Sequence, residues 1–161
     1  MNHATDLLPA GIGDSYRMGF TVGEHSARPI RRILRAFLHH WGLAGLAGDA
    51  ELALTELVAN VVRHVPGRVC RVVILRQPDG LRVEVSDACP DPVRPAPAHK
   101  GPGEPAEGGR GLLLVEALTD RWGCLPLPVG KTVWFECDAP RTADPGPPGP
   151  RHGPLPGGRA T

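Results

Sequence analysis

The sequence has few aromatic residues: Phe, Trp and Tyr make up 4% of its 161 residues. Its core must therefore be built from aliphatic side chains, and a hydrophobic content of 41% is enough for one ordinary core. An excess of one charge is also lacking, because 18 Lys and Arg are balanced by 17 Asp and Glu. This balance gives no electrostatic signature of non-specific binding to nucleic acid or to membranes.

Cysteine spacings typical of metal and redox sites are also absent. The four cysteines are Cys70, Cys89, Cys124 and Cys137, and none of them form a Cys-x-x-Cys pair. The first ten residues hold no Lys or Arg and no apolar run, and no stretch has the length that a bilayer requires. We therefore expect a cytoplasmic protein with reduced, packed thiols, no membrane partner and no cysteine-based metal site.

Glycine and proline are abundant, with 21 and 19 residues, and they concentrate in two segments. Residues 139–161 are rich in both and poor in large apolar side chains, which predicts a disordered tail. Residues 90–109 separate two patterned regions, and so long a loop is usually functional or disordered. We expect residues 16–138 to form one domain, preceded by an extension over 1–15.

Hydrophobic periodicity predicts a strand, two helices, two strands, a loop, a helix and two final strands. Strands are expected at 16–22, 69–75, 81–86, 122–127 and 132–137, and helices at 27–41, 49–64 and 110–119. Ser26 is the expected N-cap of the first helix, and Gly42 is expected to end it. Antiparallel hairpins with helices gathered on one face predict an α+β fold. Specifically, this is a two-layer α/β sandwich with a mixed, mainly antiparallel sheet.

The second predicted helix contains polar residues at four-residue spacing. Glu56, Asn60 and His64 follow one another along one face of it. A solvated helix edge explains this pattern most simply. However, Asn has poor helix propensity, and the surrounding residues are largely apolar. A carboxylate beside an amide can also position a hydroxyl group and bind a hard cation such as Mg²⁺.

Three further sites have both a structural and a functional interpretation. Asp87 ends a strand. It is interpreted either as an Asx-turn residue or as a buried carboxylate that accepts a hydrogen bond from a ligand. Gly108–Gly111 opens the third helix, where free backbone N–H groups suit phosphate, although this signal alone is weak. Gly130, Lys131 and Thr132 lead into the last strand, and a simple hairpin turn is the plainer interpretation.

The order of these signals is more specific than any one of them. Glu56–Asn60, Asp87, Gly109–Leu112 and Gly130–Trp134 together resemble the ATP-binding domain of the GHKL superfamily, the Bergerat fold. Glu107–Val115 and Asp120–Gly123 are similar to anti-sigma-factor serine/threonine kinases of the RsbW and SpoIIAB type, as found in actinobacteria. The resemblance covers about residues 16–138.

This resemblance implies a role for each matching residue. Glu56 would be the general base, and Asn60 would bind Mg²⁺. Asp87 would accept a hydrogen bond from the adenine amine, and Thr132 would support the adenine. Gly109 and Gly111 would approach the phosphates, with Arg110 nearby as a charge contact. Leu112 would also belong to the cofactor-binding residues, and residues 90–107 would form a lid. The implied cofactors are ATP and Mg²⁺. The implied partners are a sigma factor and an anti-sigma-factor antagonist, and a homodimer is compatible with the resemblance.

One departure from the family pattern leaves alternatives open. The adenine motif Asp-x-Gly is replaced here by Asp87-Ala88-Cys89, so a glycine that allows close backbone approach is missing. One alternative is a partner-binding module of the same fold without catalysis, which Cys89 favours and the intact Glu56 and Asn60 disfavour. The other is the catalytic domain of a split histidine kinase. It is disfavoured because no phosphoacceptor helix precedes the domain in this sequence.

Overall fold

A five-stranded sheet in the order β1-β2-β3-β5-β4 forms one layer of the computed structural model, which describes residues 13–91, 93 and 110–141. The strands are β1 (Ser15–Thr21), β2 (Val69–Gln77), β3 (Gly80–Asp87), β4 (Arg121–Pro126) and β5 (Lys131–Asp138). Every neighbouring pair of these strands is antiparallel. The described sheet is therefore wholly antiparallel, where the sequence predicted a mainly antiparallel one.

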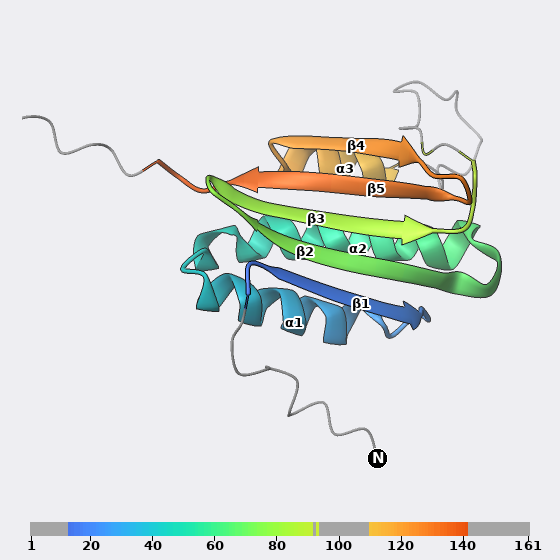
Figure 1. Ribbon diagram of the computed structural model, residues 1–161, viewed down its shortest axis with the longest axis horizontal. Helices are drawn as coiled ribbons and strands as arrows, with labels where there is room; N and C mark the ends of the chain where they lie inside the picture. Colours follow the sequence, from blue (N-terminus) through green and yellow to red (C-terminus); the bar gives the residue numbers. More distant parts are fainter. Residues whose placement is uncertain (1–12, 92, 94–109, 142–161) are drawn as a thin grey trace, which may run out of the picture.

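Three α-helices form the second layer, behind the sheet in Figure 1. They are α1 (Ala27–His40), α2 (Ala47–His64) and α3 (Arg110–Leu118), and two short 3₁₀ helices, η1 (Ala44–Leu46) and η2 (Pro66–Arg68), flank α2. The predicted α+β two-layer sandwich is confirmed, and the element boundaries lie within a few residues of the expected ones. The predicted extension, lid and tail lie almost entirely outside the described residues.

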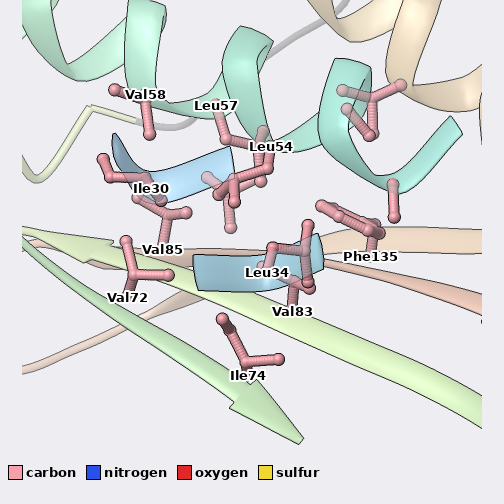
Figure 2. Packing of buried hydrophobic residues seen from close by; sticks show 14 of the residues in the cluster. Ile30, Leu34, Leu54, Leu57, Val58, Val72, Ile74, Val83, Val85 and Phe135 are labelled. Carbon is pink, nitrogen blue, oxygen red and sulfur yellow. The ribbon is translucent and has the colours of Figure 1, made fainter. Parts of the chain in front are cut away.

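The core lies between the helices and the inner face of the sheet. Alternate strand residues, among them Val83, Val85 and Phe135, point toward the helices. Figure 2 shows Leu54, Leu57 and Val58 of α2 packed on that side. The cluster is mostly aliphatic, as the low aromatic content predicted, and burying such side chains supplies most of the driving force for folding.

Both ends of α1 lie where the sequence predicted, although the N-cap side chain makes no capping bond. Gly42 follows the C-cap with φ +73°, and the Gly42 and Leu43 N–H groups donate to the carbonyls of His39 and Leu38. This Schellman motif ends the helix where the sequence predicted. Ser26 holds the N-cap position, but its side chain makes no capping bond. Its Oγ instead accepts a hydrogen bond from Gly23 N at 2.8 Å, so it stabilises the preceding turn.

The outer face of the sheet carries an ion-pair network across β3, β5 and β4. Arg82 pairs with Glu84 and Glu136 at 2.7 and 2.8 Å, and Arg121 pairs with Glu136 and Asp138. Hydrogen bonds from Arg121 hold the pKa values of both Glu136 and Asp138 below their usual range. Arg121 is half exposed, so its pairs contribute little to stability. This face is remote from the cavity described next.

Candidate nucleotide site

A cavity of about 390 Å³ opens between α2, the end of β3 and the start of β5. Its walls are largely apolar and include Leu57, Val85 and Leu112. Polar side chains line the same cavity, namely Asn60 and His64 of α2, Asp87 of β3 and Lys131 of β5. An apolar cleft of this size with a few convergent polar groups is typical of a small-molecule site.

Asp87 lies at the base of this cavity because of strand alternation. Val83, Val85 and Asp87 point to the helix side of β3, so the carboxylate ends a row of buried aliphatic side chains. Its side chain is 4% exposed. Oδ1 accepts hydrogen bonds from Cys89 N at 2.8 Å and from Lys131 Nζ at 3.0 Å. Asp87 is thus both an Asx-turn residue and a buried carboxylate beside the cavity.

The second oxygen of Asp87 differs from the first. Among the described residues, none donates a hydrogen bond to Oδ2. Asp87 lines the cavity, so a ligand there can approach its carboxylate. A buried carboxylate with one anchored oxygen and one available oxygen can accept a hydrogen bond from a ligand N–H group.

Lys131 is a neighbour of Asp87 to which the sequence analysis assigned no role. It is the first residue of β5 and lies directly opposite Asp87 in the sheet register. Its Nζ donates to Asp87 Oδ1 and to the Cys89 carbonyl, both at 3.0 Å, and its side chain is 7% exposed. Burial leaves this ammonium dependent on its hydrogen-bond partners, because water does not replace them.

Thr132 is not brought into the cavity. Adjacent strand residues point to opposite faces, so Thr132 lies on the outer face while Lys131 and Val133 line the cavity. The Thr132 Oγ1 and Ser86 Oγ are hydrogen bonded at 2.8 Å there. The side chain to which the resemblance assigned support of adenine is therefore bonded to Ser86 on the opposite face of the sheet from the cavity. Phe135, Val133 and Lys131 are spaced two residues apart, so this alternation in the sequence predicts that Lys131 faces the same side of the sheet as the apolar pair.

Gly130 allows the β4–β5 turn to approach Asp87. Its φ of +87° is a conformation that glycine adopts readily. A Cβ atom at this position would overlap the Asp87 carbonyl oxygen and the Ala88 Cα. The backbone after β3 therefore packs directly against the turn, which brings Lys131 within reach of the carboxylate.

Helix α2 and the start of α3 bring four of the predicted site residues together. Asn60 of α2 and Leu112 of α3 line the cavity, and Glu56 lies one turn before Asn60. A Cβ on Gly111 would stand 2.5 Å from Glu56 Oε2, so the missing side chain lets α3 approach the carboxylate. Arg110 is exposed at the first position of α3. Gly109 and most of the predicted lid lie outside the described residues.

A family model described as a histidine kinase-like ATPase domain matches residues 20–136 of this sequence. The chain belongs to this family. The match spans β1 to β5, and therefore includes every element that contributes to the cavity. Membership implies that this ATPase-type domain binds ATP. No curated protein sequence is significantly similar to the chain.

The ATPase-type fold is also present in a solved structure, that of the RsbU and RsbW domains of Rv1364c from Mycobacterium tuberculosis. The TM-score is 0.53 at 19% sequence identity, and the match covers 77% of this chain. It covers 32% of the other chain, so the present domain corresponds to about a third of that protein. At this identity the likeness supports the shared fold.

The residues of this ATPase-type domain are compatible with Mg²⁺ held together with a nucleotide. Among the described residues, no group of three or more His, Cys, Asp and Glu side chains could hold a metal ion by itself. Mg²⁺ bound with nucleotide usually takes few protein ligands and completes its shell with phosphates and water. The Asn60 amide oxygen at the cavity wall is a ligand of the right type.

Within the part of the chain that the structure describes, no helix combines the length and the apolar character needed to cross a membrane.

The cysteines of the domain differ in burial. Burial raises the pKa of the Cys70 thiol to about 11, with a further contribution from the Asp87 charge. Burial also raises the pKa of Cys137 to about 12. Cys89 and Cys124 are half-buried. Because the thiolate is the nucleophile, iodoacetamide at pH 8 should modify Cys89 and Cys124 well before Cys70 and Cys137. Peptide mass spectrometry of the folded protein measures this order, and equal labelling of Cys70 and Cys89 would contradict it.

Proposed function

We propose that this chain is an ATP-binding regulatory protein that acts as an anti-sigma factor and as a serine/threonine kinase. Its substrate would be a serine of an anti-sigma-factor antagonist. One observation supports this more than any other: a buried carboxylate, Asp87, keeps one oxygen available beside a cavity of about 390 Å³. Membership of the ATPase family and the RsbW-containing structural neighbour support the same proposal.

The proposed binding mode begins with the base. Asp87 Oδ2 accepts a hydrogen bond from the exocyclic amine of adenine, and Oδ1 stays bonded to Cys89 N and Lys131 Nζ. Apolar side chains such as Val85 and Leu112 pack on the ring. Asn60 would hold Mg²⁺, which would neutralise phosphate charge when bound. The N-terminal turn of α3 contributes backbone N–H groups for the phosphates.

The proposed chemistry uses Glu56. Its carboxylate accepts the proton of the substrate serine hydroxyl as that oxygen attacks the γ-phosphorus of ATP. The bond from the γ-phosphorus to the bridging oxygen breaks, and ADP leaves. Phosphoryl transfer mainly requires positioning and charge neutralisation, so a small set of residues is sufficient. Gly111 has no side chain, so α3 packs directly against the Glu56 carboxylate.

The regulatory part of the proposal concerns the two partners. Unphosphorylated antagonist would hold this chain away from the sigma factor. Phosphorylation of its serine would release the chain, which would then bind the sigma factor. The alternative is a partner-binding module of the same fold without transfer activity. Cys89 in place of the family glycine, with its backbone anchored to Lys131, favours that alternative.

A transfer assay distinguishes these functions. The protein is incubated with Mg²⁺, γ-labelled ATP and a candidate antagonist, and the modified residue is identified by its chemical stability. The proposal predicts acid-stable phosphoserine on the antagonist. Acid-labile phosphohistidine would instead indicate the split histidine kinase. Binding of ATP without transfer to any antagonist would favour the binding module.

Replacing Asn60 with Ala tests the assigned metal contact. We expect Mg²⁺ to strengthen ATP binding in the parent protein, because it offsets phosphate charge. In Asn60→Ala this Mg²⁺-dependent gain should disappear, and phosphoryl transfer should fall with it. Calorimetric titration with and without Mg²⁺ measures the gain. Arg63→Ala, an exposed change on the same helix, is the matched control and should behave as the parent. An undiminished gain in Asn60→Ala would remove the metal assignment.

A further inference from the structure

We infer that Lys131 is a base-recognition residue that donates a hydrogen bond to N1 of adenine, next to the amine bound by Asp87. The inference rests on the proposed ATP binding and extends it to a residue to which the resemblance assigned no role. It follows from the hydrogen bonds of Asp87 and Lys131, from their burial, and from the chemistry of the purine edge.

The first step is the donor count of the ammonium group. A lysine ammonium carries three N–H donors. Two of those at Lys131 are directed to Asp87 Oδ1 and the Cys89 carbonyl, both at 3.0 Å. No other acceptor among the described residues hydrogen-bonds to Nζ. One donor therefore remains for a ligand in the cavity that Lys131 lines.

The second step is the acceptor count of the carboxylate. Oδ1 of Asp87 accepts from both Cys89 N and Lys131 Nζ, whereas no described residue donates to Oδ2. The pair thus offers a ligand one acceptor and one donor side by side. Adenine offers the matching groups on adjacent atoms, because its amine donates and N1 accepts. Guanine in the same position would place its O6 acceptor against the carboxylate and its N1–H donor against the ammonium.

The third step is how firmly the donor is held. Lys131 Nζ is held by the Asp87 carboxylate at the end of β3 and by the backbone carbonyl of Cys89, two residues after Asp87. Its side chain is 7% exposed, and that of Asp87 is 4% exposed. A donor that is already positioned and desolvated loses little conformational freedom when it binds a ligand. The segment Asp87–Cys89, which departs from the family pattern, therefore has a function here: it anchors the lysine.

A ligand analogue isolates this contact. In 1-deaza-ATP a C–H group replaces N1 while the amine remains. We expect the parent protein to bind ATP at least about tenfold more tightly than 1-deaza-ATP, as a hydrogen bond from a charged donor predicts. In Lys131→Met the two ligands should bind within about twofold of each other. Lys131→Arg, which keeps a charged donor, should restore part of the preference.

Val129→Ala lies in the same hairpin at a position that is 73% exposed, and it should keep the parent preference. The parent measurement needs no variant, so equal binding of ATP and 1-deaza-ATP to the parent would overturn the inference even if Lys131→Met failed to fold. An unchanged ratio in folded Lys131→Met would also overturn it. Tighter binding of both ligands to Lys131→Met would overturn it too, because the lysine would then obstruct the site. Absence of ATP binding to the parent would overturn the proposed function and this inference together.

Discussion

Replacing Glu56 with Gln is expected to slow phosphoryl transfer to the antagonist by about 10²–10⁴-fold, because the serine hydroxyl loses its proton acceptor. ATP affinity should stay near that of the parent, since Glu56 does not line the cavity. Gln nearly preserves the size of the side chain, which matters because Glu56 lies against Gly111 at the α2–α3 contact. Single-turnover transfer and calorimetric ATP binding measure the two quantities separately.

A matched control for this change is Glu116→Gln on α3. Glu116 is exposed on the neighbouring helix, so its loss should leave both transfer and ATP binding at the parent values. Transfer by Glu56→Gln at the parent rate would exclude Glu56 as the general base. A parallel loss of ATP affinity and transfer would instead assign Glu56 to nucleotide binding.

Replacing Asp87 with Asn should weaken ATP binding by more than about tenfold, because a hydrogen bond to a charged acceptor in a buried site contributes roughly 1.5–3 kcal/mol. The structure adds a second expected effect. Lys131 would lose its buried ionic partner, and breaking such a pair typically costs about 3–5 kcal/mol of stability. Binding must therefore be measured at a temperature where denaturant unfolding shows the variant to be folded.

Purine riboside triphosphate lacks the adenine amine. It shows whether the ATP affinity lost in Asp87→Asn comes from the contact with that amine. The parent should prefer ATP over this analogue, and Asp87→Asn should lose most of that preference. Asp79→Asn, an exposed change in the β2–β3 turn, is the control and should keep it. A preference that survives in folded Asp87→Asn would remove the assignment of Asp87 to adenine.

Most of the fold was predictable because its elements have strong local signals. Leu81, Val83 and Val85 alternate with polar residues, which predicts a strand, and the structure has β3 there. The glycine that ends α1 is equally local, since its positive φ favours Gly. Ser26 was predicted as the N-cap from its residue type and position, and it holds that position. Its hydroxyl makes no capping bond and instead accepts a hydrogen bond from Gly23 N in the preceding turn.

The candidate site was only partly predictable, because its contacts join distant segments. Asp87 and Lys131 are 44 residues apart, and their pairing depends on the register of β3 and β5. The motif likeness that selected Thr132 carries no information on strand alternation, which places this residue on the outer face. The approach of Gly111 to Glu56 depends on the packing of α3 against α2, and hydrophobic periodicity does not define such a contact.

The most direct test of ATP binding at Asp87 is a calorimetric titration of the purified protein with ATP and with GTP, each with and without Mg²⁺. We predict saturable binding of one ATP per chain, strengthened by Mg²⁺, with GTP weaker by at least about tenfold because its carbonyl would oppose the carboxylate. Absence of saturable ATP binding, or equal affinities for ATP and GTP, would contradict this assignment.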